Sequence, residues 1–410
     1  MLANLTMPTL LQINVTANRG STGEIAEAIG REALSRGWKS YIAYGRYAGP
    51  SDSELIRIGC SFSTLAHYAS QRLFDNEGLC STRATRRLIK QIERLNPDVV
   101  QLHNLHDHYL NYRLLFEYLN SSGIRVVWTM HDFWAVTGHC MHFFGADCRR
   151  YADGCRSCPM KGVFPRSLID RSARNYNLKK SLFASSENLS IVAVSPWVAE
   201  TLSGSFLKDK PLTVIGNGID IQTFRPTVDA DVDEMLKDRF VILGVSAQWR
   251  YGKGIEYYRR LAEMLGNDEV LVLVGHMDSK TAKSLPENVV AIGIVTDARK
   301  LAALYTRADV LAALSPAETF GLSVAEALAC GTPAVVFDNT ALPQFVTSGT
   351  GYVVEDRNVA SAYEAIGKIK QNGRGNYSQS CIEMARRKFN IDTCAGSYVS
   401  LYERIIGRRG

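Results

Sequence analysis

Four cysteines lie close together in the segment GHCMHFFGADCRRYADGCRSCP, residues 138–159. They are Cys140, Cys148, Cys155 and Cys158. The spacing C-x7-C-x6-C-x2-C contains one close C-x2-C pair, which is typical of structural zinc sites. Four thiolates would fill the tetrahedral shell of a zinc ion and leave no position for a reacting water. We therefore expect a structural zinc site, in which His139 or His142 could replace Cys140.

Two other states of these thiols stay open, namely free packed cysteines and disulfides. The chain has nine cysteines, an odd number, and the other five are scattered, which argues against the disulfide framework of a secreted protein. The N-terminal segment MLANLTMPTLLQINV lacks the basic start and the small-residue cleavage site of a signal peptide. We therefore expect a cytoplasmic location, where zinc thiolates are favoured over disulfides.

The segment SPAETFGLSVAEALACGTPAVVF carries a second group of residues that could do chemistry. A loop with Glu318 is expected to lead into a helix whose first N–H groups, those of Leu322, Ser323 and Val324, point at an anion. Glu318 and Glu326 can each accept hydrogen bonds from hydroxyl groups. A nucleotide diphosphate sugar has this pattern, with a diphosphate between two sets of hydroxyls.

The two glutamates have the spacing E-x7-E, which EALACGTPAVVFD completes, and the stretch IGNGID precedes them at residues 215–220. With GSTGEIAEAI near the N-terminus, these motifs resemble glycosyltransferase family 4, whose members are retaining enzymes of the GT-B fold. The resemblance covers essentially the whole chain. It implies that Glu318 holds the donor sugar and Glu326 the ribose. Through HDFW, TGHC and GCRSCP it also indicates a cysteine-containing subset found in bacterial exopolysaccharide biosynthesis.

The family places an arginine and a lysine after the first strand of its second domain, where they neutralise the leaving diphosphate. In VSAQWRYGKGIEYY the candidates are Arg250 and Lys253, of which Lys253 fits the pattern better. Two cations at that place would stabilise negative charge as it develops. No carboxylate stands out as a nucleophile, so the resemblance implies a front-face mechanism in which the leaving phosphate helps to deprotonate the acceptor.

Histidines follow two expected strands of the first half. His103 ends DVVQLH and takes the place of a family histidine that contacts the transferring sugar. His131 follows RVVWTM and resembles a second such contact. His106 and His108 are expected to be structural, since a histidine without a motif has many roles.

Glycines after the first strand could let the backbone approach a ligand at the start of a helix near Glu24, although a plain tight turn explains them as well. The catalytic residues expected from motifs and resemblance are His103, Arg250, Lys253 and Glu318. The residues expected to bind the donor are Gly20, Gly23, His131, Asn217, Gly218, Phe320, Gly321, Leu322, Ser323 and Glu326.

These residues need a scaffold, and the chain alternates short apolar runs with longer helical patterns from end to end. The runs predicted as strands are residues 10–15, 40–45, 98–103, 125–131 and 190–195 in the first half, and 240–246, 270–275, 289–293, 309–314 and 333–337 in the second. That alternation predicts an α/β protein with two doubly wound, Rossmann-like parallel sheets, which in the GT-B fold face a cleft. We expect an acceptor-side domain over residues 1–196 and a nucleotide-sugar domain over 197–385. A helix over 386–410 is expected to pack back on the first domain.

The composition limits the class of protein. Hydrophobic residues make up 46% and charged residues 21% of the chain, and no apolar run reaches the roughly 18 residues of a membrane helix. A net charge of +6 suits an anionic ligand or surface and does not indicate nucleic acid. The predicted helix over residues 81–96 has Arg83, Arg86, Arg87 and Lys90 beside Leu88, Ile89 and Ile92, so it could lie on an anionic membrane or be an ordinary amphipathic helix.

The sequence therefore predicts a retaining glycosyltransferase that uses a UDP- or GDP-linked sugar and a hydroxyl acceptor, such as a lipid-linked or growing polysaccharide. A nucleotide-sugar epimerase of the same fold and a noncatalytic zinc-dependent binding module are the alternatives. No catalytic metal is expected. The overlapping D-x-D patterns of DADVD, residues 229–233, are expected to be a solvated loop.

Overall fold

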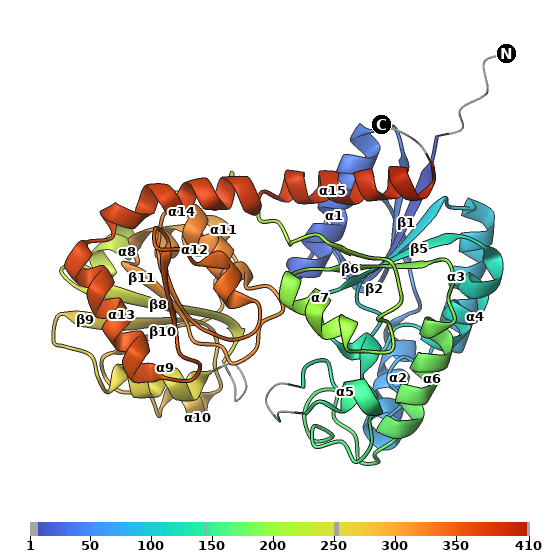
Figure 1. Ribbon diagram of the computed structural model, residues 1–410, viewed down its shortest axis with the longest axis horizontal. Helices are drawn as coiled ribbons and strands as arrows, with labels where there is room; N and C mark the ends of the chain where they lie inside the picture. The colour runs from blue at the N-terminus through green and yellow to red at the C-terminus, as the bar shows by residue number, and fades with distance from the viewer. Residues whose placement is uncertain (1–6, 144–145, 147, 250–253, 408–410) are drawn as a thin grey trace. The chain divides into compact units, whose positions relative to one another are not determined.

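The structure is a computed structural model that describes residues 7–143, 146, 148–249 and 254–407. The chain divides into two compact units, Met1–Gly216 together with Asp392–Gly410, and Asn217–Ile391. Each unit contains one sheet whose strands are all parallel (Figure 1). The predicted pair of Rossmann-like sheets is confirmed.

The first unit has a seven-stranded sheet in the order β3-β2-β1-β4-β5-β6-β7. Its inner strands are apolar runs, such as the fully buried β4, because crossover helices cover both faces of a parallel sheet. The strands are β1 (Thr9–Ala17), β2 (Lys39–Ala48), β3 (Glu54–Arg57), β4 (Val99–Leu102), β5 (Arg125–Met130), β6 (Leu189–Ala193) and β7 (Leu212–Val214). The helices are α1 (Gly20–Ser35), α2 (Ser61–Phe74), α3 (Thr82–Leu95), α4 (Tyr112–Ser122), η1 (Trp134–Val136), α5 (Arg150–Asp153), α6 (Ser172–Ala184), α7 (Pro196–Ser203) and α15 (Ile391–Ile405).

The second unit has a six-stranded sheet in the order β10-β9-β8-β11-β12-β13. The strands are β8 (Phe240–Gln248), β9 (Glu269–His276), β10 (Val289–Ile292), β11 (Val310–Ala313), β12 (Ala334–Phe337) and β13 (Gly351–Val354). The helices are α8 (Ala230–Met235), α9 (Ile255–Ala262), α10 (Ser279–Ala282), α11 (Ala298–Arg307), α12 (Leu322–Ala329), η3 (Leu342–Phe345), α13 (Val359–Asn372) and α14 (Gly375–Lys388). DADVD is part of α8 and not a loop, because the Asp229 side chain accepts hydrogen bonds from the N–H groups of Asp231 and Val232 and caps the helix.

Three strands were not predicted, and all three lie at sheet edges: β3, β7 and β13. Their side chains are largely half-buried or exposed, so no apolar run marks them in the sequence. Because β7 pairs with β6, the first unit continues to Gly216 and not only to residue 196 as predicted.

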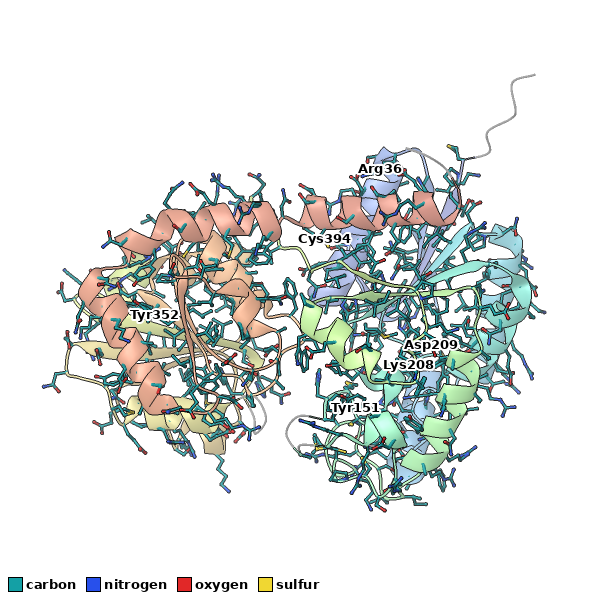
Figure 2. The ribbon with its side chains drawn as sticks, viewed as in Figure 1. Arg36, Tyr151, Lys208, Asp209, Tyr352 and Cys394 are labelled. Atoms are coloured by element: carbon teal, nitrogen blue, oxygen red, sulfur yellow. The ribbon has the colours of Figure 1, made fainter. Side chains whose placement is uncertain are left out.

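The C-terminal helical region consists of two helices. α14 belongs to the second unit, and α15 returns to the first. Arg36, which caps the C-terminus of α1, lies next to α15 (Figure 2). It donates a hydrogen bond to Ser400 Oγ and pairs with the Glu403 carboxylate at 3.3 Å. The Tyr402 hydroxyl donates to Gln101 Oε1 on the buried strand β4 at 2.9 Å. The change of unit therefore falls at residues 391/392, not at 385/386 as predicted.

The helix predicted as a possible membrane contact is α3, and two of its apolar side chains are buried in the protein. Leu88 is 3% and Ile92 0% exposed, so both belong to the core of the first unit. The expectation that they face a membrane is wrong, and α3 is an ordinary amphipathic helix. Among the residues described above, no helix has the length and apolar character that a membrane span requires.

Candidate active site

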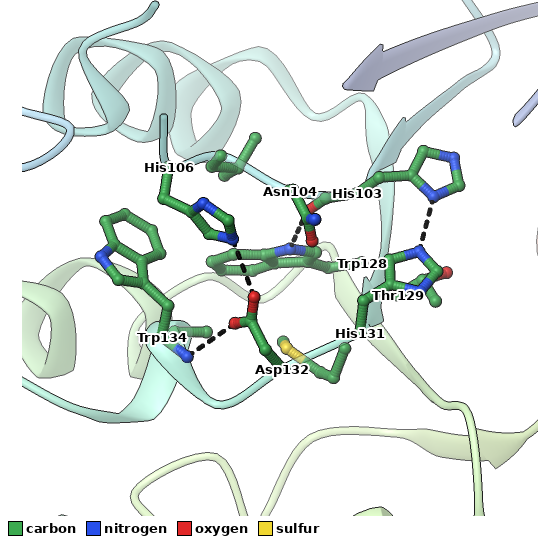
Figure 3. Close-up of a pocket in the computed structure, with 11 residues that line it drawn as sticks. His103, Asn104, His106, Trp128, Thr129, His131, Asp132 and Trp134 are labelled. Carbon is green, nitrogen blue, oxygen red and sulfur yellow. Dashed lines mark hydrogen bonds and ion pairs between the residues drawn. The ribbon is translucent and has the colours of Figure 1, made fainter. Parts of the chain in front are cut away.

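His103 and His131 follow the neighbouring strands β4 and β5 and meet at the carboxyl ends of those strands (Figure 3). His103 Nδ1 lies 3.1 Å from His131 Nε2, and the two rings stack with their centroids 5.4 Å apart. On its other side, His103 Nε2 lies 3.1 Å from Oε1 of Gln12 on β1. His103 is buried and His131 half-buried. The structure thus brings the two predicted histidines together, with His103 behind His131.

Gln12, His103 and His131 form a chain of hydrogen bonds, and the orientation of the Gln12 amide assigns the position of each proton in it. Its Nε2 donates to the carbonyl of Ala26, so Oε1 faces His103 as an acceptor. His103 then carries its proton on Nε2, and its Nδ1 accepts from the Nε2–H of His131. Burial lowers the pKa of His103 well below its usual value and that of His131 to about 4. Both rings are therefore neutral near pH 7.

His106 forms an ion pair beside these two rings. Its Nε2 lies 2.7 Å from the Asp132 carboxylate, whose other oxygen accepts a hydrogen bond from the Trp134 N–H. Burial opposes the charge on His106, but the Asp132 charge outweighs burial and raises the pKa of His106 to about 9. Despite burial, the charge of His106 and its hydrogen bond lower the pKa of Asp132 to about 2. The expected structural role of His106 fits this pair, which fixes the loop that carries His131.

The predicted glycine turn follows β1. The helix α1 begins at Gly20, earlier than the expected start near Glu24, and Gly20 has a positive φ of 67°. At Gly23 a Cβ would lie only 2.8 Å from Thr16 Oγ1, so the close packing of this turn requires glycine. Asn14 links the turn to the end of β4, since it donates to Thr22 Oγ1 and accepts from the N–H of Asn104.

Gln12 and Asn14 were not predicted as site residues. Both are fully buried polar side chains in the otherwise apolar strand TLLQINVTA. Buried polar groups need hydrogen-bond partners, so this pattern is a signal that could have identified them.

In the second unit, the loop before α12 is held by apolar contacts. Phe320 is buried and its ring packs edge-on against Phe345 at 4.9 Å. Gly321 has a φ of 110°, and a Cβ there would lie 2.7 Å from Leu342 Cδ2. The loop conformation therefore requires glycine at this position.

The N-terminus of α12 opens toward a small cavity of about 20 Å³ whose lining includes Glu318 and Ser323. The Val324 N–H donates to the Gly321 carbonyl and so is not directed at an anion as predicted. By helix geometry, the N–H groups of Leu322 and Ser323 are the ones without intrahelical acceptors. The structure brings Glu318 and the start of α12 to one cavity.

Glu326 lies further along α12 and does not line that cavity. Its Oε2 accepts a hydrogen bond from the hydroxyl of Tyr305, a buried residue on α11, at 2.7 Å. Burial and the Glu326 charge raise the pKa of Tyr305 well above its usual value, so its hydroxyl remains a donor. Tyr305 therefore orients the carboxylate.

The remaining predicted residues of the second unit lie before α9. Asn217 and Gly218 are buried at the beginning of the second unit. The Asn217 amide oxygen accepts no hydrogen bond from the residues described. Arg250 and Lys253 lie outside the described residues. Gly254 follows them with a φ of 81°, and a Cβ there would lie 2.2 Å from the Leu314 carbonyl oxygen.

The nine cysteines all lie in the described residues, and none of them forms a disulfide. The Cys140 and Cys158 thiols share a hydrogen bond, which lowers the pKa of Cys158 to about 7. Burial raises the pKa of Cys155 to about 11. Cys148 and Cys158 both lie near enough to Cys155 to influence it electrostatically.

His139 adjoins this group and has the geometry of a metal ligand. Its Nδ1 lies 2.6 Å from the Asp75 carboxylate, and both side chains are buried. Its Nε2 is buried and has no hydrogen-bond partner among the described side chains and backbone. A carboxylate on one histidine nitrogen and a bare second nitrogen is the arrangement that orients zinc ligands. Thiols and an imidazole are ligand types that zinc prefers, whereas the structure does not bring three of these ligand atoms within 4.8 Å of one another in the described residues.

Within the described ranges, the set of three ligand atoms that does gather closely is that of His67, Glu77 and His108, with one atom from each lying within 4.8 Å of the others. Both nitrogens of His67 are occupied, since Nδ1 contacts Ser81 Oγ and Nε2 accepts from the Gly78 N–H. His108 Nδ1 pairs with Glu77 at 2.5 Å. These contacts fit the expected structural role of His108.

Comparisons with known proteins identify the class of enzyme. Residues 23–223 match the family model Glycosyltransferase Family 4, and residues 231–388 match the model Glycosyl transferases group 1. The protein is a glycosyltransferase. Its GT-B fold is shared with the sucrose-phosphate synthase of Thermosynechococcus elongatus, at a TM-score of 0.71 and 16% identity over 98% of this glycosyltransferase and 99% of that chain.

Two further relatives cover most of the glycosyltransferase. The "Putative colanic acid biosynthesis glycosyl transferase WcaC" of Escherichia coli (strain K12) is 26% identical over 97% of this chain and 100% of its own length. The HepE protein of Anabaena, solved in complex with UDP-glucose, has a TM-score of 0.63 and 14% identity over 97% of this chain and 99% of its own.

Proposed function

We propose that this glycosyltransferase uses a UDP- or GDP-linked sugar and transfers the sugar with retention to a hydroxyl of a lipid-linked or growing polysaccharide. The observation that carries the proposal is the α12 site, where Glu318, Ser323 and the start of the helix share one cavity. A helix N-terminus binds phosphate, and a carboxylate beside it binds sugar hydroxyls.

The donor is proposed to lie along α12. The Leu322 and Ser323 N–H groups would take the diphosphate, Glu318 the sugar, and Glu326 the ribose. Phe320 and Gly321 fix the loop before α12. Asn217 and Gly218 are the first residues of the same unit. The solved HepE protein binds UDP-glucose, which supports a uridine donor, whereas a mycobacterial relative that is 44% identical over 71 residues is described as GDP-mannose-dependent.

For the reaction, the acceptor hydroxyl oxygen forms the new bond to the sugar C1 while the bond from C1 to the diphosphate oxygen breaks. The leaving diphosphate takes the hydroxyl proton on the same face, so no protein nucleophile is needed. Arg250 and Lys253 are proposed to neutralise the departing charge. The neutral His131 would accept a hydrogen bond from a sugar hydroxyl at Nδ1, with His103 and Gln12 holding its ring.

The polysaccharide acceptor is supported by the colanic acid biosynthesis relative and by the clustered cysteines. We propose that Cys140, Cys148, Cys155 and Cys158 hold a structural zinc ion, with His139 as the replacement ligand that its bare Nε2 favours. Such an ion would stabilise the segment that follows β5 and would supply no reacting water. It would act only on folding.

A panel of UDP- and GDP-linked sugars tests the function. A thermal shift with one donor identifies the base and sugar, because a ligand that binds only the folded protein raises the unfolding midpoint. Incubation of that donor with bacterial membrane lipid and glycan extracts should then release free nucleotide diphosphate and label a glycan. Lys253→Ala should reduce this rate about a hundredfold. Interconversion of two nucleotide sugars without nucleotide release would instead show an epimerase.

A further inference from the structure

Helix α2 buries polar side chains and exposes apolar ones, which is the reverse of an ordinary surface helix. The fully buried side chains of α2 are the polar His67 and Gln71, one turn apart. Gln71 donates to the Pro165 carbonyl at 3.1 Å, and His67 accepts from the Gly78 N–H. The polar side of this helix is therefore fastened to the protein by hydrogen bonds.

Five large apolar side chains of α2 are exposed to solvent: Phe62, Leu65, Tyr68, Leu73 and Phe74, here named the α2 face. By helix geometry Phe62, Leu65 and Leu73 lie on the side opposite His67 and Gln71. Phe62 is 80% and Leu65 64% exposed. Leaving such side chains in water has no benefit for folding, since each would gain from burial. Large apolar side chains exposed on one element are typical of an interaction surface.

A neighbouring loop extends the α2 face. Phe164 and Leu168 are exposed there, and the Leu168 N–H donates to the carbonyl of Arg72 on α2. Arg171 lies over the Phe74 ring at 5.8 Å. The loop is thus attached along α2, on the side of the first unit away from α15 (Figure 1).

Positive charge borders the α2 face. Residues 61–74 and 160–171 contain the cations Arg72, Lys161, Arg166 and Arg171 and the single carboxylate Asp170. Asp170 is engaged locally, since it accepts from the N–H groups of Cys158 and Ser172. The charge of the surface is therefore complementary to an anionic partner.

A cavity of about 430 Å³ adjoins the α2 face and shares Leu65, Tyr68 and Phe164 with it. Its lining also includes Arg46 and Arg57, neither of which forms an ion pair with a described carboxylate. An apolar face beside a cationic, aromatic-lined cavity suits a hydrocarbon layer with anionic head groups above it.

We propose that the α2 face docks on an anionic membrane surface, with Phe62 and Leu65 in the interfacial layer and the bordering cations at the lipid phosphates. This docking would place the adjoining cavity at the membrane surface. The docking itself is independent of the proposed function, and only the binding of an acceptor in that cavity rests on it. A protein interface with a second copy is the alternative that the experiment must separate.

The test is flotation with vesicles of phosphatidylglycerol and phosphatidylcholine, compared with phosphatidylcholine alone. We expect salt-sensitive binding to the anionic vesicles. The double substitution Phe62→Ser and Leu65→Ser should weaken it about tenfold or more. The matched control is Val228→Ser with Ile294→Ser, which alters side chains of the second unit that are 83% and 64% exposed. The control should float as the unaltered protein does.

Circular dichroism and the unfolding midpoint should be unchanged in both double variants, because the substituted side chains are exposed. Binding of UDP, measured by calorimetry, gives a separate readout, so a failure of flotation and a failure of the proposed donor site are distinguishable. The proposal is overturned if the unaltered protein ignores anionic vesicles or if the Phe62/Leu65 variant floats equally well. A dimer that these two substitutions dissociate, without vesicle binding, would assign the face to a second copy.

Discussion

Among single residues, Tyr305 offers an indirect test of the donor site, because it contacts Glu326 and is not proposed to contact the donor itself. Tyr305 lies on α11, and its hydroxyl donates a hydrogen bond to Glu326. Tyr305 does not line the α12 cavity and is not among the residues predicted to contact the donor. A hydrogen bond of this kind contributes about 0.5–1.5 kcal/mol. The effect of losing it should therefore appear in binding and hardly in chemistry.

We expect Glu326→Ala to weaken nucleotide-sugar binding and Tyr305→Phe to weaken it less, by about twofold to tenfold. Glu318→Ala should mainly lower turnover, because Glu318 is proposed to hold the reacting sugar. Calorimetry with the donor and steady-state kinetics separate the two effects. Glu287→Ala, at an exposed glutamate of the same unit, is the control. Unaltered binding and turnover in both glutamate variants would remove α12 as the donor site.

The His106–Asp132 pair predicts a pH dependence. The pKa of His106 is raised from 6.5 to about 9, so its contribution to stability is complete below about pH 6.5 and is lost as the pH rises through 9. The pKa of Asp132 is lowered from 3.8 to about 2, so its contribution is present above pH 3.8 and is lost as the pH falls through 2.

Histidine NMR should show His106 titrating near pH 9 and His131 neutral down to about pH 4. In Asp132→Asn the pKa of His106 should fall, since burial then acts without the opposing charge. Glu117→Gln, at an exposed helix position in the same unit, should leave it unchanged. A His106 that titrates near 6.5 in the unaltered protein would contradict the ion pair.

Among the elements, the segment between β5 and α6 depends most on the zinc proposal. Its later part, residues 148–164, contains the short helix α5 and no buried side chain, so apolar packing contributes little to the stability of that part. We expect about one zinc per chain by elemental analysis, and loss of several degrees in the unfolding midpoint for Cys155→Ser or Cys158→Ser. Cys60→Ser is the control because Cys60 is exposed, whereas Cys381 is fully buried. A metal-free sample of equal stability would leave the cysteines as packing residues.

For the whole molecule, the return of the chain to the first unit should be essential to that unit's stability. The hydroxyls of Tyr398 and Tyr402 on α15 bond to Thr129 and Gln101, which are buried polar groups of the central strands. Removal of residues 392–410 would leave both groups without these partners, at about 1–3 kcal/mol each. Calorimetry should show a lower transition for the first unit with the second unit's transition kept. Tyr402→Phe should have a smaller effect in the same direction, and an unchanged profile in the truncated chain would contradict this role.

Much of this architecture follows from local sequence. The strands that were predicted include every inner strand of both sheets, because a strand covered on both faces must be an apolar run. The turns at Gly20 and Gly321 were also readable, since glycine tolerates the positive φ that each adopts. Charge and composition set the class of ligand but not its place.

Tertiary structure decided what local patterns left open. β3, β7 and β13 are strands because a neighbouring strand offers hydrogen bonds at a sheet edge, which no local run reveals. α3 and α2 both have apolar and charged residues, yet α3 buries Leu88 and Ile92 whereas α2 buries His67 and exposes Phe62. The periodicity of a helix shows that it has two sides, but which side is buried depends on the groups that the rest of the chain places against it.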